Sequence, residues 1–407
     1  MNISEEKRQE AVDYSVSAIH HICENIGGRE SGSKEEYDAE LWLEKEMMDN
    51  KWADTSEIEE FPVASKALVG HTKIIGVMLI IGALLQLAWF AGEQAGKIVA
   101  IIGIVLAVAS LTITVFEFLL YKKFIDKLLK NTTSHNLYCK YKPTGEVKRR
   151  IIFNGHVDSA YEWSLMKIKQ NVMVVVLVTD LLCAIATIVI AIMALINPAM
   201  WQFITMACFA VPYLGLFFVC NFNVVVPGAN DNLTGVLNAV AVLKCLSESG
   251  IRLENTEVCC LATGSEEAGL RGAWNFADTH KDEINEVPTA VMVFDTLRDM
   301  DYLTIYKRDM TNLVKNDADC VKLVDKAAQK INHPLAHGGV PFGASDAAIL
   351  SRKGVKAVCV AGQDPLHANY YHNTRDTADN LRPDTMRVCL DLSLAAVEIF
   401  DKEGFGE

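Results

Sequence analysis

Residues 257–272 read EVCCLATGSEEAGLRG and combine two structural signals. The first half is an apolar run typical of a buried strand, and the second half leads through two adjacent carboxylates and Gly269 into a helical pattern. Glu266 and Glu267 therefore follow a strand directly. Because neighbouring side chains there point in different directions, one can coordinate a metal ion while the other faces a substrate. Two adjacent glutamates alone are more often an exposed acidic turn, so the interpretation depends on the rest of the chain.

Strands and helices alternate on both sides of this stretch. Short β-rich runs are expected at 58–63, 137–141, 150–153, 257–262, 290–294, 302–306 and 357–360. Helical patterns follow Ser4 and Ser33, the second with Glu36 in a capping box, and cover 233–246, 270–279, 312–331 and 383–400. This alternation predicts an α/β fold with a mostly parallel, mixed central sheet flanked by helices. Ligands bind at the carboxyl ends of the strands in such sheets.

Five side chains of metal-binding type stand at strand ends or in loops. They are His156 in GHVD, Asp231 in GANDN, Glu267, Asp295 in VFD and His372 in YYHN. Each has an ordinary explanation when taken singly, since Asp231 could cap a helix and His372 could be a surface histidine. Together, two imidazoles and three carboxylates suit a divalent ion such as zinc. Buried groups of this kind are costly unless they are paired or bound to metal.

The motifs around these residues form a longer series. They are GHVDSA, GANDNLTG, TGSEEAGLRGA, VFD and YYHNTRDTADNL, with GGRESGS near the start and GASDAAILSRKGVKAV before the last ligand. The series resembles that of the co-catalytic di-zinc aminopeptidase family, which includes leucyl aminopeptidases and glutamate carboxypeptidase-like enzymes. Sister families of zinc exopeptidases share parts of it, and the closing YHNTRDTADNL favours this family. The resemblance implies the zinc exopeptidase fold and two bound divalent metal ions, expected to be Zn²⁺.

The resemblance also implies a role for each ligand. His156 and Asp295 would bind one metal ion, Glu267 and His372 would bind the other, and Asp231 would bridge both. Two such ions lower the pKa of a bound water and polarise a scissile carbonyl.

Three further residues would act beside the metal ions. Glu266 would be the general base, taking a proton from the attacking water and passing it to the leaving amine. Tyr371 matches a tyrosine that in some members of the family stabilises the tetrahedral oxyanion. Asp158 would accept the second ring N–H of His156 and so fix its tautomer. The sequence departs from the family pattern at Asp231, which asparagines flank where a further acidic residue is usual.

Four apolar stretches interrupt the chain, at 74–91, 98–120, 172–196 and 201–226. Each reaches or nearly reaches the ~20 residues that a helix needs to cross a bilayer, so we expect two transmembrane hairpins. The expected organisation is a peptidase domain formed by 1–65, 131–170 and 227–407, with the hairpins at 66–130 and 171–226. The family resembled does not usually carry such hairpins.

Lysines mark the side of the membrane from which the hairpins enter, and only Lys97 flanks the far side. The near-side residues are Lys66, Lys73, Lys122, Lys123, Lys127, Lys130, Lys167 and Lys169. The positive-inside rule therefore predicts an integral, multi-pass cell membrane protein whose catalytic domain and both termini are cytoplasmic. We expect Glu117 to reach the interface, Asp180 to pair between helices, and Pro212 to kink the fourth helix. The spans could also support a homo-oligomer.

Composition excludes several classes of protein. A net charge of -13 leaves no basic face to neutralise phosphates, so no nucleic-acid partner is expected. The 11 cysteines include no CxxC pair, which indicates reduced thiols rather than a zinc ribbon.

The expected function is that of a membrane-bound, zinc-dependent exopeptidase, an aminopeptidase with peptide substrates. A carboxypeptidase or dipeptidase on the same zinc pair would need a cationic group for the substrate carboxylate, and Arg271, Arg298 and Arg375 are candidates. The complete two-metal set makes a glutaminyl cyclase-like acyl transfer the weaker alternative. A non-catalytic membrane adaptor is disfavoured because neither a ligand nor the base is missing. A transporter is disfavoured because four helices with two polar residues offer little pathway.

Overall fold

The computed structural model describes residues 1–365 and 367–406, which form two compact units. The first, here the sheet unit, comprises Met1–Ser65, Asn131–Ala160 and Val225–Glu407. The second, here the helical unit, comprises Lys66–Lys130 and Tyr161–Val224. Relative to the boundaries expected from the sequence, residues 161–170 group with the second hairpin rather than with the sheet.

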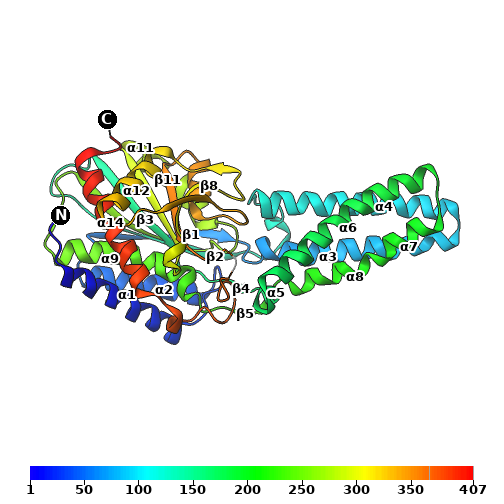
Figure 1. Ribbon diagram of the computed structural model, residues 1–407, viewed down its shortest axis with the longest axis horizontal. Helices are drawn as coiled ribbons and strands as arrows, with labels where there is room; N and C mark the ends of the chain where they lie inside the picture. Colours follow the sequence, from blue (N-terminus) through cyan, green and yellow to red (C-terminus); the bar gives the residue numbers. More distant parts are fainter. Residues whose placement is uncertain (366, 407) are drawn as a thin grey trace. The chain divides into compact units, whose positions relative to one another are not determined.

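A mixed sheet forms the centre of the sheet unit (Figure 1). The strand order is β1-β2-β6-β3-β7-β11-β8-β10, and β9 pairs with β8. The bounds are β1 (Thr55–Val63), β2 (Thr132–Tyr141), β3 (Arg149–His156), β6 (Thr256–Thr263), β7 (Thr289–Leu297), β8 (Leu303–Asp309), β9 (Val314–Lys315), β10 (Ala336–Gly339) and β11 (Ala357–Gly362). Strands β6, β3, β7 and β11 run parallel, whereas β1, β2, β8 and β9 add antiparallel pairs at the two sides. The predicted α/β fold with a mixed central sheet is confirmed.

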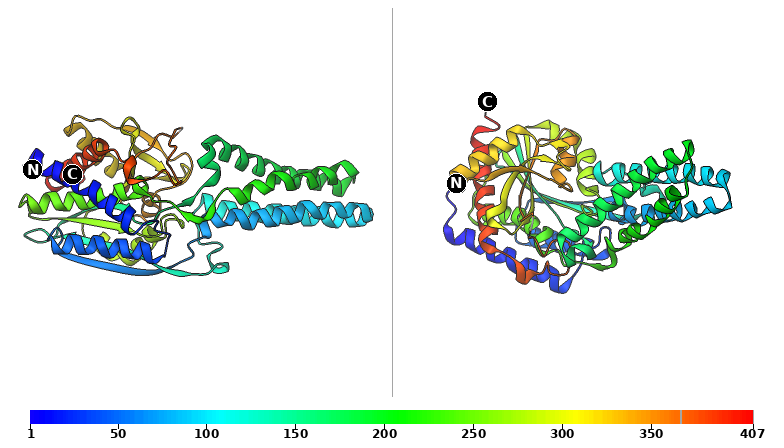
Figure 2. Two further views of the ribbon diagram at one scale, coloured as in Figure 1. Left: turned by 90° about the horizontal axis from the view of Figure 1, so that it is seen from below. Right: turned by 45° about the vertical axis from the view of Figure 1, so that its right-hand side comes forward.

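Helices cover both faces of this sheet, as the further views in Figure 2 show. One face packs against α1 (Glu5–Asn25), α2 (Lys34–Asp49), α9 (Thr234–Glu248), α12 (Ala318–Lys330) and α14 (Pro383–Glu403). On the other face lie α10 (Arg271–Thr279), α11 (Lys281–Glu286) and α13 (Asp346–Arg352). The adjacent residues Cys259 and Cys260 point to opposite faces: Cys260 joins the main core, and Cys259 lies 3.5 Å from the Tyr138 hydroxyl. Such alternation is the period-2 geometry of a strand.

Two local predictions for the sheet unit need correction. The helix expected over 312–331 begins only at Ala318, because 314–315 pair with β8 as β9 and Asp317 caps the helix through its side chain. Ser33 does cap α2 by accepting from the Glu36 N–H, but the Glu36 carboxylate does not return to the cap residue. It accepts from Gly32 N instead and is fully buried.

The helical unit contains four helical segments that are long and apolar enough to cross a membrane: Ala67–Ala91, Glu93–Leu119, Asn171–Ile196 and Met200–Phe218. They consist of α3 (Ala67–Leu85) with η1 (Gln86–Ala91), α4 (Glu93–Ile113) with η2 (Thr114–Leu119), α6 (Gln170–Ile196), and α7 (Met200–Cys208) with α8 (Ala210–Tyr213) and η4 (Leu214–Phe218). The short α5 (Ser164–Ile168) precedes α6, and β4 (Tyr161–Glu162) pairs with β5 (Asn221–Val225). The apolar stretch expected to run to residue 226 therefore ends as a helix at Phe218.

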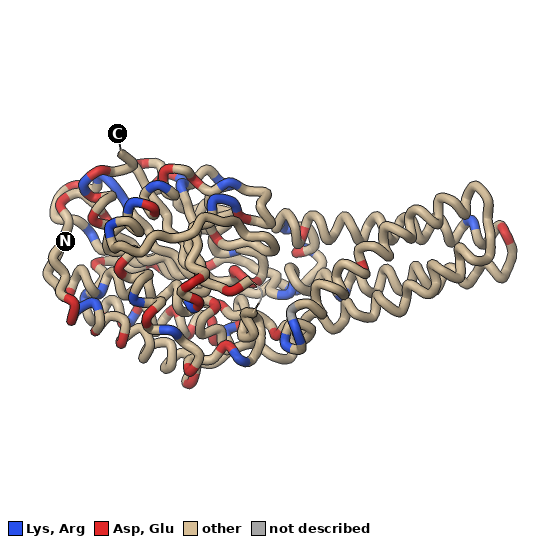
Figure 3. Tube along the Cα trace, viewed as in Figure 1, with Lys and Arg blue, Asp and Glu red and all other residues tan. Residues whose placement is uncertain are grey.

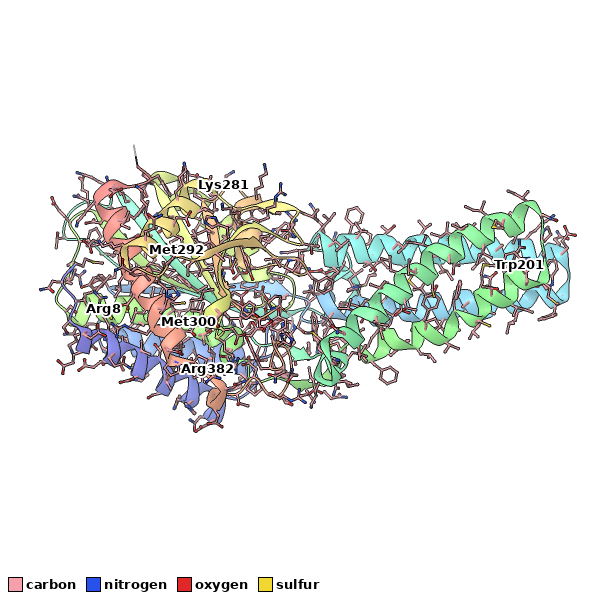
Figure 4. All side chains as sticks on the ribbon, in the orientation of Figure 1. Arg8, Trp201, Lys281, Met292, Met300 and Arg382 are labelled. Atoms are coloured by element: carbon pink, nitrogen blue, oxygen red, sulfur yellow. The ribbon has the colours of Figure 1, made fainter. Side chains whose placement is uncertain are left out.

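The outward faces of these helices are apolar. Few charged residues lie along them in Figure 3, and the many exposed side chains include Ile81, Val105, Leu182 and Val211. Figure 4 shows side chains projecting from these helices and labels Trp201, which lies in the first turn of α7. A water-soluble unit would not leave so much apolar surface exposed, whereas a bilayer would cover it.

Two polar residues in the spans differ in their surroundings from what the sequence suggested. Glu117 does not reach outward: it is fully buried, and its Oε2 accepts from the backbone N–H groups of Phe124 and Ile125. Asp180 is likewise buried, but its carboxylate oxygens have no hydrogen-bond partner among the described residues, so the expected pairing between helices is not seen. Pro212 does interrupt the fourth segment, which is divided into α7, α8 and η4 because proline lacks the N–H that a continuous helix requires.

Candidate active site

Three candidate ligands come from neighbouring strands of the parallel core. His156 is the last residue of β3, Asp295 lies near the end of β7, and Glu267 follows β6 after a short turn. The register places His156 beside Thr263 of β6, and Asn154 beside Val293 of β7. Because carboxyl ends of parallel strands share one edge of a sheet, these ligands meet there, as the sequence predicted.

The other two ligands arrive on loops. Asp231 lies in the turn before α9, and His372 lies in the loop before η7 (Ala378–Asn380). His156 Nε2 is 3.3 Å from Asp231 Oδ1, and His372 Nε2 is 3.1 Å from Asp231 Oδ2. His372 Nε2 is also 3.3 Å from Glu267 Oε1. Each oxygen of Asp231 therefore faces a different histidine.

The side chains are close enough to hold metal. The ligand atoms of His156, Asp231 and Glu267 lie within 4.8 Å of one another, and so do those of His156, Glu266 and Asp295. Nitrogen and oxygen ligands at 2.0–2.1 Å from a tetrahedral zinc ion are themselves about 3.3 Å apart, close to the separations observed. Asp231 Oδ2 and Glu267 Oε1 are buried, and among the described residues neither has a hydrogen-bond donor in good geometry, although His372 Nε2 lies 3.1 and 3.3 Å away. Unsatisfied carboxylate oxygens at such spacing are suited to a cation.

The electrostatics of the cluster also favour a bound cation. Burial opposes the charged form of His372, but Glu267 and Asp231 outweigh it and raise its pKa to about 10. Burial raises the pKa of Asp295 to about 7, with the charge of Asp231 adding to the effect. Burial also raises the pKa of Glu267. The cluster holds more carboxylates than its two imidazoles can neutralise, so bound cations would relieve the excess of negative charge.

Glu266 lies beside the two sets of ligands. Its Oε2 is 3.9 Å from His156 Nε2 and the side chain is buried. Burial raises the pKa of Glu266 well above its ordinary value, partly opposed by His156 and reinforced by Glu267, Asp346 and Asp295. A carboxylate with a raised pKa can hold a proton between two steps of a reaction, which is what a general base requires.

Asp158 has a wider role than the one expected from sequence. His156 Nδ1 lies 3.1 Å from the Asp158 backbone carbonyl, and the Asp158 Oδ1 is farther, at 3.4 Å. The backbone oxygen is thus the better placed acceptor for the histidine. The Asp158 carboxylate accepts from the N–H groups of Glu266 and Glu267, each at 3.0 Å, and from the Ser31 hydroxyl at 2.7 Å. It therefore holds the turn that carries the candidate base and one ligand.

Tyr371 packs against the last ligand. Its ring stacks on His372 with centroids 3.9 Å apart. Burial, followed by the charges of Asp231 and Glu267, raises the pKa of the phenol well above its ordinary value. The hydroxyl therefore stays protonated and is able to donate a hydrogen bond.

Several residues that support the site were not identified from sequence. Asp376 accepts from Asn230 N at 2.9 Å, Asn230 Nδ2 at 2.7 Å and Asp231 N at 3.0 Å, so it fixes the loop of the bridging ligand. Asn232 donates to Phe294 O and accepts from Thr296 N, which ties the same loop to β7. The asparagines beside Asp231 thus serve as structural hydrogen-bonding groups. Asp376 stands four residues after His372 in YYHNTRDT, and that spacing was the available signal.

Two fully buried residues of the N-terminal segment also brace the site. Arg29 donates to the carbonyls of Val157, Pro227 and Gly228, which joins the loops of the first two ligands. Glu36 accepts from Ser265 N at 2.8 Å and from Ser134 Oγ at 2.8 Å. The GGRESGS motif that contains Arg29 was noted in the sequence without a role.

Comparison with known proteins gives a family match. Residues 211–397 match the sequence profile of peptidase family M28, described as "Peptidase_M28: Peptidase family M28". No curated protein sequence matches the chain.

Solved structures resemble the whole chain in fold. The aminopeptidase from Aneurinibacillus sp. strain AM-1 aligns with a TM-score of 0.56 at 14% identity, covering 97% of this chain and 96% of that one. BSAP, a zinc aminopeptidase from Bacillus subtilis, aligns with a TM-score of 0.56 at 15% identity, covering 95% and 94%. A glutaminyl cyclase from Bacteroides thetaiotaomicron aligns with a TM-score of 0.55 at 12% identity, covering 97% and 99%. At these identities the likeness concerns the fold.

Proposed function

We propose that the chain, whose residues 211–397 match the profile of peptidase family M28, is a membrane-bound, zinc-dependent aminopeptidase that hydrolyses N-terminal residues from peptides. The observation that carries the proposal is the position of Asp231 between two histidines, with each carboxylate oxygen toward one of them. One bridging carboxylate with a histidine and a second carboxylate on each side is the ligand set of a two-metal hydrolase.

Five residues of the chain would act as metal ligands. His156, Asp231 and Asp295 would hold one zinc ion, and Glu267 and His372 would hold the second together with Asp231. Bound zinc would polarise the scissile carbonyl and acidify the attacking water.

Proton transfer and charge stabilisation fall to two other side chains. Glu266 takes the proton from the water and delivers it to the leaving nitrogen, since its raised pKa favours a transient protonated state. Tyr371 keeps its proton and donates to the oxyanion that develops on the former carbonyl.

The surroundings of the candidate arginines favour an aminopeptidase over a carboxypeptidase. A carboxypeptidase would need an available cation to hold the substrate carboxylate. Arg271 is buried and donates to Gly269 O, and Arg298 is bonded to Asn380 and Asp299. Arg375 is exposed and donates to Asn369 O. The arginines named as candidates for a carboxypeptidase are thus engaged elsewhere.

The decisive experiment uses the purified full-length protein reconstituted in liposomes with zinc. We expect it to release N-terminal residues from a free peptide and to leave an N-acetylated peptide intact, while C-amidation has no effect. Glu266→Gln keeps the shape of the side chain but removes the base, so kcat should fall by roughly two to four orders of magnitude. Glu286→Gln, on an exposed turn of α11, is the matched control and should retain activity.

Other outcomes would identify another function. Cleavage that requires a free C-terminus would indicate a carboxypeptidase. Loss of ammonia from a peptide with an N-terminal glutamine, without hydrolysis, would indicate the cyclase alternative. Full activity of Glu266→Gln, or a preparation that binds no divalent metal and cleaves nothing, would overturn the proposal.

A further inference from the structure

A carboxylate without a partner lies inside the helical unit. Asp180 of α6 is only 4% exposed, and neither of its oxygens has a hydrogen-bond partner. Among the described residues it also forms no ion pair. An unneutralised charge at membrane depth costs several kcal/mol, so an intramembrane carboxylate that persists has a counterion or a role.

The packing of α4 against α6 identifies what faces Asp180. These helices run in opposite directions, with Ala100 and Ala191 in one core cluster and Ala107 and Ala184 in another. Between them, a Cβ on Gly103 would lie 3.7 Å from Thr187 Cγ2. From one facing pair to the next, the residue number on α4 increases by about as much as the residue number on α6 decreases.

Extending this register by one helical turn places Ser110 of α4 opposite Asp180. Ser110 is 1% exposed, and its hydroxyl oxygen also has no hydrogen-bond partner. Two independent unsatisfied polar groups therefore meet at one level of the bundle.

A third element completes the surroundings. Gly215 of η4 lies against α6, and a Cβ at that position would be 2.6 Å from Val176 Cγ1 and 3.8 Å from Asp180 Oδ2. The missing side chain allows the backbone of η4 to approach α6 closely. Backbone carbonyl groups of this irregular segment, which follows Pro212, are therefore candidates for the remaining oxygen ligands.

We propose that Asp180 and Ser110 form a buried binding site for a small monovalent cation, of the sodium class, within the helical unit. Carboxylate, hydroxyl and carbonyl oxygens are hard ligands suited to such ions. One positive charge neutralises the one carboxylate, whereas a divalent ion would leave an excess charge in an apolar environment. The site is separate from the proposed peptidase centre, so its test does not depend on peptidase activity.

The experiment measures thermal unfolding of the full-length protein in detergent, with excess zinc, at constant pH and ionic strength. Sodium chloride replaces choline chloride stepwise, and potassium chloride is a parallel series. A cation that binds the folded state raises the Tm in a saturable manner, and at a sodium concentration 100 times the Kd the gain is about 2.7 kcal/mol. Direct binding of radioactive sodium should approach one ion per chain.

Variants locate the site. Asp180→Asn should abolish the sodium-dependent rise in Tm and the bound sodium, and Ser110→Ala should move the rise to higher concentrations by about tenfold. Glu93→Gln is the control, because this carboxylate is exposed at the start of α4 and pairs with Lys97. It should respond as the wild type does.

Three results would overturn the proposal. One is a wild-type Tm that is equal in sodium and choline, which would mean that Asp180 is neutralised by a proton alone. Another is a shift that needs magnesium or calcium. The third is sodium binding that persists in Asp180→Asn. The wild-type series decides the question even if a variant fails to fold.

Discussion

The bridging position proposed for Asp231 depends on a neighbouring carboxylate, that of Asp376. Asp376 accepts three hydrogen bonds from Asn230 and Asp231, and together they use both of its carboxylate oxygens. In Asp376→Asn an amide N–H group would oppose backbone N–H donors. We expect zinc affinity and kcat/KM to fall by roughly 10- to 100-fold with little change in fold. Zinc titration with a competing chelator measures this directly.

Asp379→Asn provides the matched control, because Asp379 is exposed three residues later, in η7. Its zinc affinity should equal that of the wild type. If Asp376→Asn bound zinc as tightly as the control, the bonds of Asp376 would have only a local role.

A second prediction at this scale concerns pH. His280 contacts Glu59 through Nε2 and Glu283 through Nδ1, the latter at 2.8 Å. Burial lowers the pKa of His280, but the two carboxylates outweigh it and raise the value to about 9. A raised pKa means that the ion pairs stabilise the fold fully below pH ~6.5, and that this contribution disappears as the pH rises through about 9.

A comparison of His280→Gln with the wild type tests whether this stabilisation decreases as the pH rises. At pH 6 the variant should be less stable by about 1–3 kcal/mol, and the gap should narrow as the pH approaches 10. Chemical unfolding at a series of pH values gives the difference. His333→Gln, after α12, should show no such narrowing. A gap that widens with pH would contradict the assignment.

Residue types with an intrinsic preference for metal were found from sequence, whereas their supports were not. His156 and Glu267 follow apolar runs, so their place at the sheet edge could be predicted. Asp376 and Glu36 could not be assigned, because an aspartate in a loop or a glutamate in a first helical turn usually faces water. The backbone N–H groups that donate to Asp376 and Glu36 come close to them only in the tertiary fold.

At the scale of elements, the site depends on a close approach of β3 and α9. A Cβ on Gly155, next to His156, would lie 2.4 Å from Val236 N and 2.5 Å from Gly235 C. Both are backbone atoms of α9 and cannot rotate away. We expect Gly155→Ala to lower the free energy of unfolding by about 1–3 kcal/mol or more and to weaken zinc binding together with it.

A glycine in ordinary packing is the control for this prediction. A Cβ on Gly70 of α3 would meet Phe222 and Lys66 at 3.5 and 3.6 Å, which is normal contact. Gly70→Ala should be neutral or slightly stabilising, because alanine favours a helix. Unfolding curves of both variants, with zinc titrations, make the comparison. Equal stability would mean that β3 and α9 can separate without cost.

Helices and strands with a strong hydrophobic periodicity were predicted well from the sequence. Short strands that form only by pairing with another strand were not. Strands β6, β7 and β11 and helix α14 appear within a few residues of the predicted ranges because burial dictates their patterns. The start of α12 was predicted too early, since β9 forms only through its partner β8. Likewise, 221–225 read as the end of an apolar helix but pair with β4.

At the scale of the whole molecule, metal removal should destabilise the sheet unit. Without cations the carboxylates of the site repel one another, and binding to the folded state alone adds about 4.1 kcal/mol when free zinc is 1,000 times its Kd. A chelator should therefore lower the Tm by roughly 5–10 °C, and added zinc should restore it. Asp231→Asn, which impairs the bridge, should show a smaller change on chelation.

The distribution of lysines predicts an orientation of the chain in the membrane. Lysines cluster on the side where the hairpins enter, and the turn at 92–96 is followed by a single lysine, Lys97. Positive residues are retained on the cytoplasmic side, so the termini and the sheet unit should be cytoplasmic and this turn external.

A cysteine introduced by Gln94→Cys should react with a membrane-impermeant maleimide on intact cells. One introduced by Asp278→Cys, at an exposed position in the last turn of α10, should react only after lysis. The native cysteines are mostly buried, and the unmodified protein measures their background. Labelling of Asp278→Cys on intact cells would reverse the topology and place the zinc site outside, where the available peptides are different.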